Sequence, residues 1–225
     1  MTGEGKAKSL ALPEFRSRGI RSRQTPGQVD RPYSWYSIFA NREYGMQHPN
    51  LRSQDVVVLA KLLALGGGPR PPIAPMGVAL GLSASEVHGS LRRLEQARLL
   101  AKGPSGTRPL LHAAEEFLVH GVKYAFPARR GEVTRGMPTS YAAPPLSAHF
   151  AADADLPPVW PHPEGVRGVA VEPLYRTAPA AALRDPALYE LLALIDAVRE
   201  GRARERKLAA EELRRRIRGL GDARP

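Results

Sequence analysis

The chain has 225 residues, 43% of them hydrophobic, which allows one large domain or a small domain with an appended part. Lysine and arginine outnumber aspartate and glutamate by 33 to 22, a net charge of +11, so we expect an anionic partner and nucleic acid first. The absence of cysteine excludes disulfides, thiolate metal sites and cysteine nucleophiles, and it fits a reducing cytoplasm.

The sequence gives no sign of a membrane span or a secretion signal. The longest apolar run, Val56–Leu65, is interrupted by Lys61 and is too short to cross a bilayer. The first residues lack the charged-then-apolar pattern of a signal peptide. We therefore expect a cytoplasmic protein with no membrane partner.

The first segment, residues 1–45, is basic and has glycine and proline scattered along it. It shows no sustained helical or strand period, which predicts a largely disordered arm. The first folded domain is predicted over residues 46–126.

Three helices are predicted at the start of this domain. The first covers residues 53–65, with Ser53 as its N-cap. The second is short, has Pro75 in its first turn and runs to Leu80. The third, from Ser83 to about Leu99, opens on a capping box formed by Ser83 and Glu86.

A hairpin and a further helix are predicted to complete the domain. Leu100–Lys102 and Thr107–Leu111 flank a Gly-Pro-Ser-Gly turn, which is typical of a short β-hairpin. A helix is then predicted over residues 113–125, before Pro127.

The segment Ile73–Arg93 has the pattern of a helix-turn-helix. Gly77 is small enough for close contact with the next helix, and Gly81 permits the turn. The inward positions are apolar: Met76, Leu80, Leu82, Val87 and Leu91. A glycine turn between helices is common in any helical bundle, so the motif alone is weak. A preceding buried helix, a capping box, a following hairpin and a basic chain, in that order, favour a winged helix-turn-helix.

The second helix of this motif leaves small or polar residues pointing outward: Ser85, His88, Gly89, Arg92 and Arg93. Such residues can enter a major groove, and Arg92 is the best candidate for reading a base. Ser83 and Ser85, with the free N–H groups of the first turn, are expected to hold a phosphate. The hairpin residues expected to reach the DNA backbone or minor groove are Lys102, Thr107 and Arg108.

Residues 51–111 resemble the winged helix-turn-helix regulators of the MarR type, through LRSQDVVVLAKLLAL and then IAPMGVALGLSASEVHGSLRRLEQARLLAKG. The resemblance implies DNA binding by a recognition helix from Ser83 to about Leu99 and a wing near Gly103–Arg108. It also implies a homodimer on a palindromic operator.

The second half of the chain is predicted as two parts. Residues 127–179 are crowded with proline and glycine, and only Val166–Val171 has the pattern of a strand. Apolar residues such as Trp160 are too frequent there for a solvated linker, so we expect an ordered strap packed over the helices. Residues 180–220 are predicted to form a helical hairpin, capped by Asp185 at its start.

The sequence shows no motif for metal binding, cofactor binding or catalysis. Six histidines are scattered without the spacing of a zinc site, and no nucleophile elbow, HExxH motif or clustered Asp pair is present. His162, with Trp160 and Glu164, is similar to a fragment of a binding site, but a structural role is the stronger interpretation. We expect no enzyme activity, no cofactor and no metal.

The predicted fold class is mainly α with a small β-hairpin wing: a winged helix-turn-helix, a Pro-rich strap and C-terminal helices. The leading hypothesis is a bacterial transcriptional regulator that binds double-stranded DNA sequence-specifically. The alternative is an interaction protein, an antitoxin or adaptor, that captures a protein partner with residues 127–220. A third interpretation, dimerisation or RNA binding by the arginine-rich C-terminal helix, is weaker because interspersed glutamates indicate an ordinary solvated face.

Overall fold

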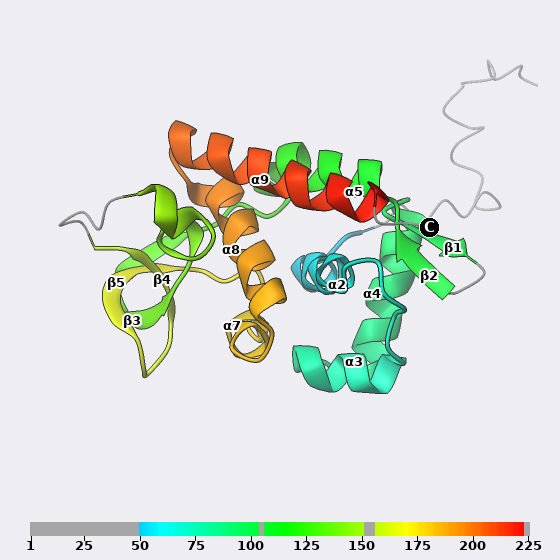
Figure 1. Ribbon diagram of the computed structural model, residues 1–225. Helices are drawn as coiled ribbons and strands as arrows, with labels where there is room; N and C mark the ends of the chain where they lie inside the picture. The colour runs from blue at the N-terminus through cyan, green and yellow to red at the C-terminus, as the bar shows by residue number, and fades with distance from the viewer. Residues whose placement is uncertain (1–49, 104–105, 151–155, 223–225) are drawn as a thin grey trace, which may run out of the picture. The chain divides into compact units, whose positions relative to one another are not determined.

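The computed structural model describes residues 50–103, 106–150 and 156–222, so the basic arm of residues 1–45 lies outside the described residues. Three helices and a hairpin come first along the described chain (Figure 1). Their bounds are α2 (Ser53–Ala64), α3 (Ile73–Leu80), α4 (Ala84–Gln96), β1 (Leu100–Gly103) and β2 (Gly106–Pro109). The predicted fold class, mainly α with a small hairpin, is confirmed.

Helix α2 is the most buried element of this part, with Val56 through Ala60 fully enclosed. Its N-cap is Arg52 rather than the expected Ser53, because the Asp55 carboxylate accepts the backbone N–H of Arg52 at 2.8 Å. The helix ends at Ala64, just before Gly66 and Gly67 take left-handed φ values of 64° and 85°. A carboxylate in the first turn thus sets where the helix starts, and glycines set where it stops.

A continuous helical segment follows the hairpin. It consists of α5 (Leu111–Glu116), a π-helical turn η1 (Phe117–Gly121) and α6 (Val122–Ala125). Its buried residues Leu118 and Val122 belong to the main hydrophobic core. The segment contacts α8 (Pro186–Glu200) and α9 (Ala203–Asp222), so the residues after the hairpin are packed against the C-terminal helices.

Residues 127–179 fold into a small sheet, which corrects the expectation of an extended strap with one strand. The strands are β3 (Arg130–Pro138), β4 (Pro158–Pro161) and β5 (Val166–Val171), and each pairs with the other two. β3 runs antiparallel to both β4 and β5, whereas β4 and β5 are parallel. Short 3-10 turns, η2 (Ser140–Ala142) and η3 (Leu146–His149), follow β3.

Glycine made these strands hard to recognise, although the sheet requires it. A Cβ on Gly136 would lie 2.1 Å from the Trp160 carbonyl oxygen, and one on Gly168 would lie 2.1 Å from the Pro157 oxygen. Both glycines are therefore sites of close backbone approach rather than loop residues. β3 also shows no regular alternation of buried and exposed residues, so it lacks the usual strand signature.

The C-terminal helices are α7 (Ala178–Ala182), α8 (Pro186–Glu200) and α9 (Ala203–Asp222). Asp185 caps α8 as expected, since its carboxylate accepts the backbone N–H of Leu188 at 3.1 Å. Residues 191–198 of α8 are all buried, and the helix contacts α2, α6, α7 and α9. Helix α8 is thus an internal element of the fold. None of the helices in the described ranges combines the length and the apolar character that a bilayer crossing requires.

Asp196 joins the sheet to α8. Its side chain is 1% exposed and accepts hydrogen bonds from Thr139 Oγ1 at 2.9 Å and Trp160 Nε1 at 2.6 Å, together with an ion pair from Arg199. Burial raises the pKa of the Asp196 carboxyl, against the opposing effect of these donors. Nearby, the Tyr189 hydroxyl donates to the Pro138 carbonyl at 2.7 Å, and burial raises the pKa of Tyr189 to about 12.

Apolar residues of the region predicted as a strap, residues 127–179, pack inside the chain. Leu146, Trp160 and Leu174 are between 1% and 5% exposed and belong to the main core. The Trp160 ring also packs against Tyr189, with ring centroids 6.0 Å apart. Packing within the chain therefore accounts for the apolar character of these residues.

Candidate nucleic-acid interface

The turn between α3 and α4 depends on two glycines, as the sequence predicts. Gly81 ends α3 with a left-handed φ of 65°. A Cβ on Gly77 would lie 2.6 Å from the Leu82 carbonyl oxygen, and the Leu82 N–H donates to the Gly77 oxygen at 2.9 Å. Side chains at these positions would strain the backbone or separate the two helices. Contacts among a few consecutive residues therefore fix how α3 and α4 cross.

The predicted capping box at the start of α4 is confirmed. Ser83 Oγ accepts the Glu86 N–H at 3.2 Å, and Glu86 Oε2 accepts the Ser83 N–H at 2.7 Å. The hydrogen bond from the Ser83 backbone is the largest of several contacts that lower the pKa of Glu86. The Ser83 hydroxyl is thus engaged within the helix start, whereas Ser85 is exposed and free of this cap.

The outer face of α4 carries Ser85, His88 and Arg92, all exposed. Among the described residues, none of these three side chains has a hydrogen-bond or ion-pair partner. Val87, Leu91 and Leu94 on the opposite side are buried. The helix therefore presents a row of unengaged polar groups to solvent and an apolar stripe to the core.

The Arg93 side chain points toward α2 and not outward as expected from the sequence. Its Nε donates to Asp55 Oδ2 at 2.7 Å and its Nη2 to Asp55 Oδ1 at 2.6 Å, a bidentate pair with a carboxylate that is fully buried. The bond to Asp55 raises the pKa of Arg93. A Cβ on Gly89 would lie 3.2 Å from Arg93 Nη1, so Gly89 leaves room for this guanidinium. Arg93 thus holds α4 to α2 instead of facing outward.

The hairpin places its predicted residues on different faces. Lys102 lies opposite Thr107 and Ala101 lies opposite Arg108, so Lys102 and Thr107 share one face and Arg108 lies on the other. Thr107 Oγ1 donates to Glu95 of α4 at 3.0 Å, which fixes the hairpin to the helix. Lys102 and Arg108 are exposed, and Lys102 is on the face that meets α4.

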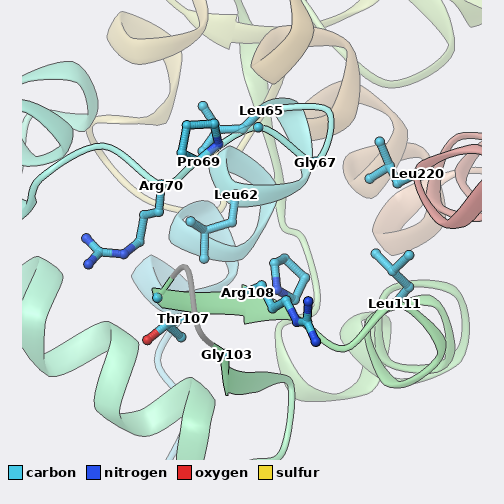
Figure 2. Close-up of a pocket in the computed structure, with 13 residues that line it drawn as sticks. Leu62, Leu65, Gly67, Pro69, Arg70, Gly103, Thr107, Arg108, Leu111 and Leu220 are labelled. Carbon is cyan, nitrogen blue, oxygen red and sulfur yellow. The ribbon is translucent and has the colours of Figure 1, made fainter. Parts of the chain in front are cut away.

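Arg108 borders a hollow of about 500 Å³ between the hairpin and the end of α2 (Figure 2). Leucines from α2, α5 and α9 line it, and Arg70, from the connector after α2, lies on the other side of Leu62 from Arg108. Arg70 Nη1 donates to the Pro71 carbonyl at 2.9 Å. The two guanidinium groups lie well apart in Figure 2, so they do not form one anion site.

The residues around His162 do not form a site together. The Trp160 indole is buried and donates to Asp196, whereas His162 Nδ1 is at hydrogen-bond distance, 2.9 Å, from the Glu164 backbone oxygen. The Glu164 side chain is exposed. The structural interpretation made from the sequence therefore agrees with their positions.

The sequence reasoning missed the double role of Asp55, which caps α2 and binds Arg93. An acidic residue in the first turn predicts a cap but not a partner 38 positions later. The surrounding run of buried valines was the available signal, because a carboxylate enclosed by apolar residues needs a cation. Arg93 meets that need.

These elements, a buried helix, a glycine turn, a capped second helix and a β-hairpin, define a winged helix-turn-helix unit. The chain is similar to the LexA repressor of Bacillus cytotoxicus, with 30% identity over 113 residues, or 49% of this chain and 54% of the repressor. The chain thus spans about half the length of the curated relative it matches. No protein-family model and no solved structure matches it. The protein matched is a repressor, and the similarity gives no support to the narrower MarR resemblance.

Proposed function

We propose that the chain binds double-stranded DNA through its winged helix-turn-helix and acts as a transcriptional regulator. The observation that carries the proposal is the outer face of α4, where Ser85, His88 and Arg92 are exposed and have no hydrogen-bond or ion-pair partner within the described part of the chain, while the neighbouring Arg93 is paired. The similarity to a repressor and the net charge of +11 support it.

In this proposal α4 lies in the major groove and Arg92 reads a base edge. A guanidinium can form two hydrogen bonds with guanine, which is the commonest specific contact of this kind. Lys102 of the hairpin, on the face that meets α4, contacts the DNA backbone. Phosphate contacts of this type supply affinity without sequence preference and make binding salt-dependent.

The first experiment is selection of bound genomic DNA fragments by the purified full-length protein at near-physiological salt. A shared motif among the bound fragments is expected, and a palindromic motif would indicate that two copies of the chain bind together. Fragments without any shared sequence would contradict a sequence-specific regulator.

Arg92→Ala tests the assignment of the base-reading residue. We expect it to weaken binding to the selected sequence by about 1 to 3 kcal/mol and to relax the base preference at one position. Fluorescence anisotropy titrations against the selected and a random duplex would measure both effects. The matched control is Arg167→Ala, an exposed arginine of β5, for which we expect unchanged affinity. Equal losses of Arg92→Ala on both duplexes would contradict the assignment.

A further inference from the structure

A segment from the second half of the chain lies against the helix-turn-helix. A Cβ on Gly81 would be 3.2 Å from Thr177 Cβ, so the residue before α7 touches the turn between α3 and α4. Arg184 Nη2, just after α7, donates to the Ala79 carbonyl of α3 at 3.3 Å. Contacts on both sides of α7 therefore fix this helix and the residues before it beside the end of α3 and the turn that leads into α4.

Arg176 is a cation that this arrangement brings to the turn before α4. Its side chain is exposed, and its guanidinium lies 5.9 Å from the centre of the Tyr175 ring. It is near enough to Glu86 in the first turn of α4 for its charge to help lower the pKa of that carboxyl, after the larger effects of Ser83. It nevertheless makes no ion pair within 4.0 Å among the residues described here.

We infer that Arg176 belongs to the DNA-binding surface and contacts a backbone phosphate beside the first turn of α4. The inference rests on the proposed function, since it assumes that α4 enters the major groove. A helix in that groove has the phosphates of the bordering strand next to it. Thr177 and Arg184 hold the segment against α3 and the turn into α4, and the exposed guanidinium belongs to the residue next to Thr177. The second half of the chain thus supplies affinity to the same interface, without base preference.

The test compares the full-length wild type with Arg176→Ala on two duplexes of about 30 base pairs, one carrying the selected motif and one of random sequence. Loss of one phosphate contact should weaken binding to both several-fold and reduce the slope of log K against log salt by about 0.9. Arg176→Lys should retain the slope, because lysine keeps the charge. Arg167→Ala is the charge-matched control and should leave both affinities unchanged.

A double-mutant cycle separates phosphate contact from simple neutralisation of Glu86. Glu86→Gln keeps a side chain that can complete the capping box. If Arg176 contacts phosphate, Arg176→Ala should cause the same loss in the Glu86→Gln background as in the wild type. No loss in that background, or an unchanged affinity for Arg176→Ala alone, would overturn the inference. Thermal melting of each variant shows whether the fold is retained.

Failure of this inference can be distinguished from failure of the proposed function. A wild type that binds neither duplex would overturn both. A wild type that binds the selected duplex, loses affinity on Arg92→Ala and is unaffected by Arg176→Ala would overturn only the inference. A loss on Arg176→Ala confined to the selected duplex would also overturn it, because a phosphate contact acts on all sequences alike.

Discussion

The turn of the helix-turn-helix and the three-stranded sheet are held by contacts of different range. In the first, the decisive contacts join neighbours: Gly77 with Leu82, and Ser83 with Glu86. In the second they join distant residues, such as Thr139 with Asp196. The turn of the helix-turn-helix is therefore encoded locally, whereas the sheet depends on a helix that follows it in the chain.

Helix α8 connects these two regions. At its start, Asp185 accepts a hydrogen bond from Lys61 of α2 at 2.6 Å, and further along Asp196 holds the sheet. The helix itself is buried along residues 191–198. Removing the second half of the chain would therefore expose the core surface of α2, so its role is better tested by point substitutions than by truncation.

The largest expected effect comes from breaking the contact between the sheet and α8. Asp196→Ala would leave the buried Arg199 guanidinium, 4% exposed, without its carboxylate and would leave the Trp160 N–H without an acceptor. Loss of one partner from a buried ion pair costs about 3 to 5 kcal/mol. We expect a decrease of this size in the free energy of unfolding, measured by urea denaturation.

Glu132→Ala is the control for this substitution, because Glu132 is an exposed carboxylate on β3. Its effect should stay within about 0.5 kcal/mol. A loss below about 1 kcal/mol for Asp196→Ala would mean that the sheet does not depend on α8.

A smaller but sharper effect separates two neighbouring arginines of α4. Arg93→Ala leaves Asp55 buried without its cation, and because Arg93 is 19% exposed we expect a loss of about 2 to 4 kcal/mol in unfolding free energy. Arg92→Ala should change stability by no more than about 0.5 kcal/mol while reducing affinity for the selected DNA. Urea denaturation of both variants measures the unfolding free energy, and anisotropy titrations measure the affinity for DNA. Equal stability of the two variants would contradict the structural role given to Arg93.

The parts of the fold that follow local rules could be predicted from the sequence. The Ser83–Glu86 capping box, the Gly81 turn, the hairpin and the Asp185 cap each need only a few consecutive residues, and the structure has all of them. The outer face of α4 could also be predicted from the sequence, because helical periodicity separates His88 and Arg92 from the buried side.

The remaining features depend on partners that local patterns do not reveal. Arg93 has the same chemistry as Arg92, and only the position of Asp55 on another helix turns it inward. β3 carries the glycines of a loop because Trp160, 24 positions after Gly136, passes very close to it. The approach of Arg176 to α4 likewise follows from contacts across the fold and not from spacing.

The smallest predicted effect concerns the junction of α2 and α8, and it depends on pH. Burial acts to raise the pKa of Asp185, but the hydrogen bonds from Lys61 and the Leu188 N–H outweigh it, so the pKa is lowered. A carboxyl with a folded-state pKa below its unfolded value, about 3.9, stabilises the fold above that pH and loses this contribution as the pH falls through the lowered pKa. Asp185→Asn keeps an N-cap side chain but removes the charge, so we expect a loss of about 1 kcal/mol or less at pH 7. This difference from the wild type should shrink steadily below about pH 4, measured by urea denaturation across the acid range. A difference that stayed constant with pH would show that the cap alone matters and that the ion pair with Lys61 does not help hold α8 against the winged helix.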